Sequence, residues 1–382
     1  MNPILGRIAA LFAVLLLLGG CGTLPRDAFD PLDARVAVPA GLADVRFAAG
    51  DAEASLTNSG PIRERIEADK GDFSVLALSG GGANGAYGAG VLAGWTKAGD
   101  RPRFDVVTGV STGALAAPFA FLGPDWDARM EAAYTDGGTD ELISLKALAP
   151  FRGPSLFSAA PVRHLVETYV DAEMLRAIAV EHAKGRRLQV ATTNLDTQET
   201  TVWDMGAIAA RADPSAIRLF QDILVASSSI PGVFPPVLIG VDGPTGRFSE
   251  MHADGGVMTP FFTVPESMLL WTDPGGGVHR GALYILINGQ VGASVGVTRG
   301  SLVGILARSW DAMSKASTRT TLAATVGFAE RNGLAVRISE IPDAAEAQGL
   351  NFKADNMRKL FRMGYDRALA GEAWHAPAKP GP

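Results

Sequence analysis

The sequence predicts an α/β fold built on a largely parallel β-sheet. From Phe73 onward, apolar runs typical of buried strands alternate with stretches of helical periodicity. Two of the strand-to-helix connections are rich in glycine, which permits tight turns. Hydrophobic residues make up 47% of the 382 residues, enough for one large core, and no internal repeat is visible.

The amino terminus has the form of a secretory signal. Arg7 precedes an apolar run over 8–18 that is too short to span a bilayer, and Leu18-Gly19-Gly20-Cys21 follows. This pattern resembles a bacterial lipoprotein signal, with a signal peptide over 1–20 and Cys21 as the lipidated residue. A plain secretory signal with a coincidental cysteine is the alternative. Cys21 is the only cysteine, so a disulfide within the chain is excluded.

Lipidation at Cys21 would place the protein at the cell envelope, because several acyl chains at one residue anchor a protein stably to a membrane surface. By the same resemblance, Gly22 rather than Asp after the cysteine favours the outer membrane of a Gram-negative cell. The following residues, 21–71, are rich in Ala, Asp, Pro and Arg and show little periodicity. We expect a tether here, with a short helix at Ile62 to Asp69.

The first expected strand, Phe73 to Leu78, runs into a glycine-rich loop from Ser79 to Gly85, and a helix is expected from Ala86 to Lys97. Bare amides at the start of a helix suit an anion, either a phosphate or the oxyanion of an acyl-transfer reaction. Gly80, Gly82 and Gly85 fit the spacing of a dinucleotide-binding loop. However, no acidic residue ends the second strand, and no GK[ST] follows the loop.

The second expected strand, Phe104 to Thr108, leads into Gly109-Val110-Ser111-Thr112-Gly113 and then an expected helix over Ala114 to Leu122. Glycines flanking a serine between a strand and a helix are typical of a nucleophile elbow, which lifts the hydroxyl clear of the sheet. An ordinary glycine-rich turn is the alternative, since the chain has 45 glycines. The flanking strand and helix favour the elbow, with Ser111 as the nucleophile.

An acidic residue, Asp254, stands before Gly255 and Gly256 and after a segment, Gly246 to Glu250, that could end a strand. Taken alone, an Asp-Gly pair is more simply a turn. In combination, the glycine loop, the GxSxG turn and the Asp-Gly-Gly segment resemble the patatin-like phospholipases, over about Phe73 to Gly256. A further match is the small-residue stretch from Asp222 to Pro236.

The resemblance implies a three-layer fold with a central, mostly parallel sheet and helices on both faces. It assigns Ser111 as nucleophile and Asp254 as its only side-chain partner, without a histidine or a cofactor. It places the oxyanion hole in the backbone of the glycine loop and the residue after the nucleophile: Gly80, Gly81, Gly82, Ala83 and Thr112. The family often has an arginine where this chain has Asn84, which donates hydrogen bonds but brings no charge.

A Ser–Asp pair restricts the chemistry. The unperturbed pKa of an aspartate is about 3.9, so the proton must move as the serine attacks, and a dry pocket must raise the basicity of the carboxylate. Such a site favours esters, because an alkoxide leaves more readily than an amine. The expected substrate is a phospholipid or another lipid ester.

The histidines offer no third catalytic member. Only His279 and His375 follow Asp254 at a distance, in a loop and in the tail. His252 lies two residues before Asp254 and could tune the site, although a histidine satisfied by its neighbours is the simpler interpretation. His164 and His182 lie in expected helices. No metal site is expected, because the acidic group of Asp136, Asp140 and Glu141 is more simply a solvated turn.

The remaining elements complete one catalytic domain over 72–345. Strands are expected at Arg187 to Asn194, Glu199 to Asp204 and Leu283 to Asn288, and helices at Pro161 to Tyr169, Ala172 to His182, Asp222 to Ser228 and Ser301 to Ala329. The last segment, 346–382, carries a basic helix over Phe352 to Leu369, which either packs on the domain or meets lipid headgroups. The net charge of −6 argues against nucleic acid as a partner.

Three classes of function follow. The first is an envelope-anchored serine hydrolase of lipid esters. The second is a non-catalytic lipoprotein that binds lipid or assists assembly with the same fold. The third is a nucleotide-binding α/β protein. Reaction of Ser111 with a serine-directed reagent would distinguish the first class from the other two.

Overall fold

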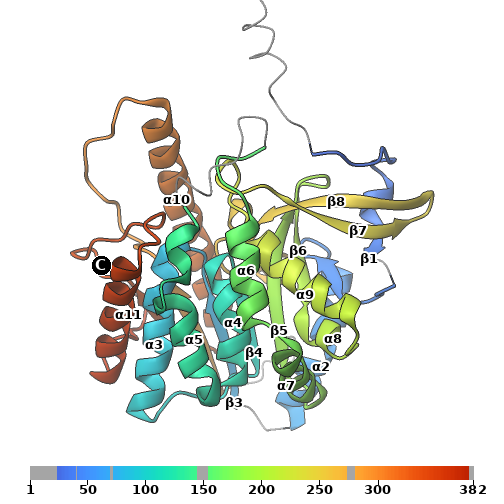
Figure 1. Ribbon diagram of the computed structural model, residues 1–382. Helices are drawn as coiled ribbons and strands as arrows, with labels where there is room; N and C mark the ends of the chain where they lie inside the picture. Colours follow the sequence, from blue (N-terminus) through green and yellow to red (C-terminus); the bar gives the residue numbers. More distant parts are fainter. Residues whose placement is uncertain (1–23, 40, 69–71, 144–153, 273–279, 378–382) are drawn as a thin grey trace, which may run out of the picture.

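The computed structural model describes residues 24–39, 41–68, 72–143, 154–272 and 280–377 (Figure 1). Its strands are β1 (Val38–Pro39), β2 (Arg46–Ala48), β3 (Asp72–Leu78), β4 (Val106–Val110), β5 (Arg187–Asn194), β6 (Glu199–Asp204), β7 (Val237–Gly243), β8 (Gly246–Asp254), β9 (Arg280–Ile287) and β10 (Ala335–Glu340). Its α-helices are α2 (Ala52–Ala68), α3 (Gly85–Ala98), α4 (Thr112–Leu122), α5 (Asp127–Thr135), α6 (Ala160–Tyr169), α7 (Ala172–Ala183), α8 (Met205–Ala209), α9 (Pro214–Ser227), α10 (Leu302–Arg331) and α11 (Ala354–Leu369).

The strands form one sheet with a parallel centre. The strands β5, β4, β3, β9 and β10 are neighbours in that order and all run parallel. The antiparallel strands β6, β8, β7, β1 and β2 extend the sheet beyond β5. In such a parallel centre all strands end at one edge, and the turns that follow β3 and β4 therefore lie close together.

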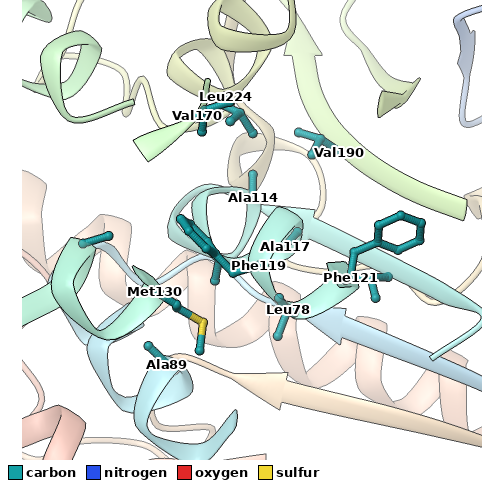
Figure 2. Close-up of a cluster of buried hydrophobic side chains, with 14 of the residues drawn as sticks. Leu78, Ala89, Ala114, Ala117, Phe119, Phe121, Met130, Val170, Val190 and Leu224 are labelled. Carbon is teal, nitrogen blue, oxygen red and sulfur yellow. The ribbon is translucent and has the colours of Figure 1, made fainter. Parts of the chain in front are cut away.

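The core occupies both faces of the sheet, which confirms the expected α/β fold with helices on both sides. In β3, Leu76 and Leu78 join the cluster that α3 and α4 cover, whereas Val75 and Ala77 join a second cluster with Phe328 of α10. This alternation follows from the twofold period of a strand. Figure 2 shows part of the larger cluster, where side chains from β3, α3, α4 and α5 meet.

The described residues of the segment 21–71 are folded onto the sheet and do not form a tether, which corrects the expectation from the sequence. Two short strands, β1 and β2, pair with β7 and β6, and Leu42, Val45 and Phe47 are buried. The described part of the expected short helix, 62–68, belongs to the longer α2. The sequence pattern misses this because strands of two or three residues carry no measurable periodicity and are stable only through pairing with distant partners.

The carboxyl-terminal helix α11 packs against α3 and belongs to the same core. Its residues Met357, Leu360 and Phe361 are buried in the cluster that contains the α3 side chains. Of the two interpretations of this basic helix, the structure agrees with packing on the domain. Within the described residues, no helix combines the length and the apolar character that a membrane crossing requires.

The contact between α3 and α11 depends on glycine. A Cβ built on Gly364 would overlap the carbonyl oxygen of Tyr87, which is backbone and cannot turn aside. We expect Gly364→Ala to destabilise the protein by about 1–3 kcal/mol, as overpacking does, and urea unfolding would measure this. Gly240→Ala is the matched control, because a Cβ there meets nothing within 4 Å. An equal stability of the two variants would contradict the proposed close contact.

Candidate active site

Ser111 occupies a strained turn between β4 and α4. Its backbone angles, φ 56° and ψ −126°, lie in a region that residues other than glycine rarely adopt. A Cβ built on Gly113 would overlap the carbonyl oxygens of Leu78 and Ser79, so only glycine permits this approach to the end of β3. The turn has the geometry of the predicted nucleophile elbow.

The turn is held by serines of α9 and its carboxyl end. The amide of Ser111 donates to Ser227 Oγ at 2.9 Å, and Ser227 Oγ donates to the carbonyl oxygen of Ala191 at 2.7 Å. Ser228 Oγ donates to the carbonyl oxygen of Ser111 at 3.3 Å. From the sequence, these serines were visible only as part of a small-residue stretch. Their role depends on side-chain hydroxyls meeting a distant turn, for which the local pattern gives no signal.

Asp254 meets Ser111 because β4 and β8 share one edge of β5. Val110 of β4 lies opposite Ala191, and Asp254 of β8 lies opposite the next residue, Thr192. The other edge of β5 is occupied by β6. The carboxyl end of β8 is thus brought to the carboxyl end of β4, where Ser111 begins the turn.

The two side chains form a direct hydrogen bond. Ser111 Oγ donates to Asp254 Oδ2 at 2.6 Å, and both residues are buried. Asp254 Oδ1 accepts the amide of Gly256 at 2.7 Å, which orients the carboxylate. The main chain of Asp254 is also fixed. Its amide donates to the carbonyl oxygen of Ser229 at 3.0 Å, and its carbonyl oxygen accepts a hydrogen bond from Thr193 Oγ1 at 2.9 Å.

The surroundings make Asp254 an unusually basic carboxylate. Burial raises the pKa of Asp254 to about 7, although hydrogen bonds from Ser111 and Gly256 act in the opposite direction. A carboxyl group with this pKa is largely ionised just above neutrality and still accepts a proton readily. It therefore has the pKa that a general base needs near neutral pH.

The glycine loop lies against the serine, but not all of its amides are available. A Cβ built on Gly80 would lie 3.2 Å from Ser111 Cβ. The amide of Gly80 donates to the carbonyl oxygen of Pro260 at 3.1 Å, and the amide of Ala83 donates to the carbonyl oxygen of Gly349 at 2.8 Å. The amides of two of the five predicted oxyanion residues, Gly80 and Ala83, are therefore not free to bind an oxyanion. Among the described residues, no acceptor is found for the amides of Gly81, Gly82 and Thr112.

A narrow cavity begins at the loop and extends into the core. It has a volume of about 50 Å³, and Gly82 and Thr112 stand among its apolar lining residues, which include Leu115, Phe119 and Val166. Tyr134 also lines it, and its hydroxyl donates to the carbonyl oxygen of Thr112 at 2.7 Å. With this volume the cavity has room for about four water molecules, so as it stands it would take only a few methylene groups beside the loop.

None of the described histidines contacts the serine or the aspartate. His252 is buried in β8, where its ring meets Glu250 Oε2 at 3.1 Å and Thr192 Oγ1 at 3.0 Å. It is a satisfied histidine, in a strand rather than in a loop. His375 pairs with Ile338 through the backbone, and His164 and His182 lie in α6 and α7. His279 lies outside the described residues.

A buried ionic group next to the site was not predicted. Arg46 of β2 forms an ion pair with Glu250, which also contacts His252. Arg46 lies over the ring of Trp203 at 5.2 Å, and Trp203 Nε1 donates to Thr192 Oγ1 at 2.8 Å. These residues link the amino-terminal segment to β8, the strand that carries Asp254.

The chain is thus an α/β protein in which a serine at a strained turn is hydrogen-bonded to a buried aspartate. Residues 76–264 match the family described as Patatin-like phospholipase. The chain therefore carries a domain of the patatin-like phospholipase family, as the order of its motifs predicted. This is a family of lipid hydrolases.

The chain is also similar to a solved structure at low sequence identity. VipD from Legionella pneumophila has 13% identity and a TM-score of 0.39, over 79% of this chain and 67% of that chain. The comparison with curated proteins found no match.

Proposed function

We propose that the protein is a serine lipid acyl hydrolase that cleaves the carboxylic ester of a phospholipid or another lipid ester. The observation that supports this most strongly is the 2.6 Å hydrogen bond between Ser111 Oγ and Asp254 Oδ2 at a strained turn. The family match supports a lipid as substrate. The dyad and its substrate are our inference from these facts.

In the proposed reaction, Asp254 takes the hydroxyl proton while Ser111 Oγ attacks the ester carbonyl carbon. Negative charge develops on the carbonyl oxygen, and the amides of Gly81, Gly82 and Thr112 are the candidates to receive it. The intermediate then expels the alcohol, which takes the proton from Asp254, and an acyl-serine remains. Water attacks this ester with Asp254 again as base, which releases the fatty acid and restores the serine.

The cavity beside the loop is the proposed site for the first carbons of the acyl chain. Its apolar lining starts at Gly82 and Thr112, two of the candidates for oxyanion binding. A chain in this cavity would bring its ester carbonyl to Ser111. We further propose attachment to the cell envelope through a lipidated Cys21, most consistently at the outer membrane. That residue lies outside the described part of the chain.

Product analysis tests this function. The protein is incubated with a phospholipid that carries two different acyl chains, and the products are identified by mass spectrometry. Release of one free fatty acid and the matching lysophospholipid is expected from the natural protein and not from Ser111→Ala. Binding of the lipid without any hydrolysis, also of simple esters, would favour the non-catalytic lipoprotein. The nucleotide-binding alternative gains no support from the family match.

The proposed base predicts a pH dependence. Only the carboxylate of Asp254 accepts the serine proton, and burial raises the pKa of Asp254 to about 7. The kcat/KM for a soluble ester should therefore rise as pH increases through about 7 and then level off. Circular dichroism at each pH serves as the control for unfolding. A constant kcat/KM between about pH 5 and about pH 8 would exclude Asp254 as this base.

A further inference from the structure

A protruding apolar tip follows β9. It consists of the loop 289–300 and the first half of α10. Val295 and Val297 in the loop are fully exposed, at 103% and 101%. On α10, Leu306 and Met313 are exposed by 59% and 61%. Aliphatic side chains gathered on a protruding segment are unfavourable in water and mark a binding surface.

The tip projects from the edge of the sheet that carries the active site. β9 runs parallel to β3, so its carboxyl end lies at the edge where the glycine loop and Ser111 lie. At this end the amide of Asn288 donates to Ser79 Oγ at 2.8 Å, at the root of the glycine loop. In Figure 1 the upper end of α10 and the loop in orange stand out above the neighbouring helices.

The tip is held in place by cations. Lys315 Nζ donates to Ser294 Oγ at 2.7 Å, and Arg308 donates to the same hydroxyl at 3.2 Å. Arg319 donates to the carbonyl oxygen of Val291 at 3.2 Å. The loop is thus bound to α10 by three long side chains, and the two valines beyond Ser294 remain outside this contact.

The charge of the tip has the opposite sign to that of the chain. Residues 289–316, the loop and the first half of α10, contain three basic residues and one acidic residue, a net charge of +2, whereas the whole chain has −6. Exposed aliphatic groups combined with basic groups suit the surface of an anionic phospholipid bilayer.

Two more exposed apolar residues lie close in the chain to residues of the site. Met258 is 45% exposed and lies two residues after Gly256, whose amide donates to Asp254 Oδ1. Leu350 is 49% exposed and follows Gly349, whose carbonyl oxygen accepts the amide of Ala83. Both residues are close in the chain to residues that contact the site.

We propose that the tip formed by 289–300 and the first half of α10 docks on an anionic phospholipid bilayer. Its valines enter the acyl region, its net positive charge attracts the anionic headgroups, and the active-site edge faces the membrane. This inference rests on the proposed function only in naming the surface from which the lipid substrate comes. Docking itself requires no catalysis.

Site-specific fluorescence tests the docking. The full chain carries Cys21→Ser and Ser111→Ala, so that the only thiol is an introduced one and no lipid is hydrolysed. A nitrobenzoxadiazole label is attached at Val295→Cys. The matched control label is at Val180→Cys, a valine of α7 that is 56% exposed and precedes the amino end of β5. Vesicles contain phosphatidylglycerol and phosphatidylcholine in equal amounts.

We expect the label at 295 to become brighter and to emit at shorter wavelength with these vesicles, and the label at 180 to remain unchanged. In the chain labelled at 295, replacing Val297 and Leu306 by Ser should reduce the inserted fraction about tenfold or more, since each buried aliphatic side chain contributes about that factor. Phosphatidylcholine alone should give a weaker response.

Several outcomes would overturn the proposal. Vesicle attachment without a change at 295, or equal changes at 295 and 180, would show that the tip does not enter the bilayer, and a protein partner would then fit the exposed valines. Because the label reports only its own surroundings, attachment through the amino-terminal segment does not imitate insertion. Failure of lipid hydrolysis in the natural protein would refute the proposed function without affecting this result.

Discussion

Ser111→Ala and Asp254→Asn are each expected to lower the hydrolysis of a p-nitrophenyl acyl ester at least about 1,000-fold, because nucleophile and base act as one unit. The first substitution removes the attacking oxygen. The second keeps an acceptor for the amide of Gly256 but removes the group that takes the proton. Initial rates with purified protein provide the measurement, and the double variant should be no slower than the slower of the single ones.

Neither substitution should unfold the protein. Ser111 is held through its backbone by Ser227 and Ser228, and these bonds do not involve its hydroxyl. Asp254→Asn removes a buried charge whose pKa is raised by burial, so the folded state should be at least as stable above neutral pH. Thermal unfolding provides the control. A folded variant that keeps full activity would refute the dyad.

Arg46→Ala is expected to destabilise the protein by about 3–5 kcal/mol, the usual effect of leaving one partner of a buried ion pair without its charge. Arg46 and Glu250 form this pair, and Glu250 is fully buried. Urea unfolding at neutral pH provides the measurement. The matched control is Arg247→Ala, because Arg247 forms an exposed pair with Asp242 that should contribute less than about 1 kcal/mol.

The same ion pair predicts that the stability of the fold depends on pH. Burial alone would raise the pKa of Glu250, but hydrogen bonds from His252 and Arg46 outweigh it and hold the pKa below its usual value. A carboxyl group with a depressed pKa stabilises the fold above its unfolded pKa of about 4.3, and this contribution is lost as pH falls further. In Arg46→Ala the loss should begin at higher pH. Equal stability of the Arg46 and Arg247 variants would contradict this role of the pair.

Elements with strong local signals could be predicted from the sequence. β5 and β6 coincide with the expected ranges, because both are rich in Val and Thr, which favour strands. The elbow was predictable for a similar reason, since a strand, two glycines and a helix are all local features. The start of α9 was missed by eight residues, although Asp213 caps it and Pro214 opens it, a recognised signal for a helix start.

The assembly of the site could not be predicted from local patterns alone. Asp254 became a strong candidate only through the family resemblance, and its approach to Ser111 depends on the register of β4 and β8 on β5. The burial of Arg46 depends in the same way on pairing between segments far apart in the chain. Whether the amides of Gly80 and Ala83 are free depends on Pro260 and Gly349, which approach only in the folded state.

The measurement that tests the central claim most directly is reaction with a fluorophosphonate, followed by peptide mass spectrometry of the natural protein and of Asp254→Asn. We predict rapid modification at Ser111 in the natural protein and a rate at least about 100-fold lower at the same residue in the variant, because the reagent requires a serine activated by its base. Modification of a different serine, or equal rates at Ser111 in both proteins, would contradict the proposed dyad.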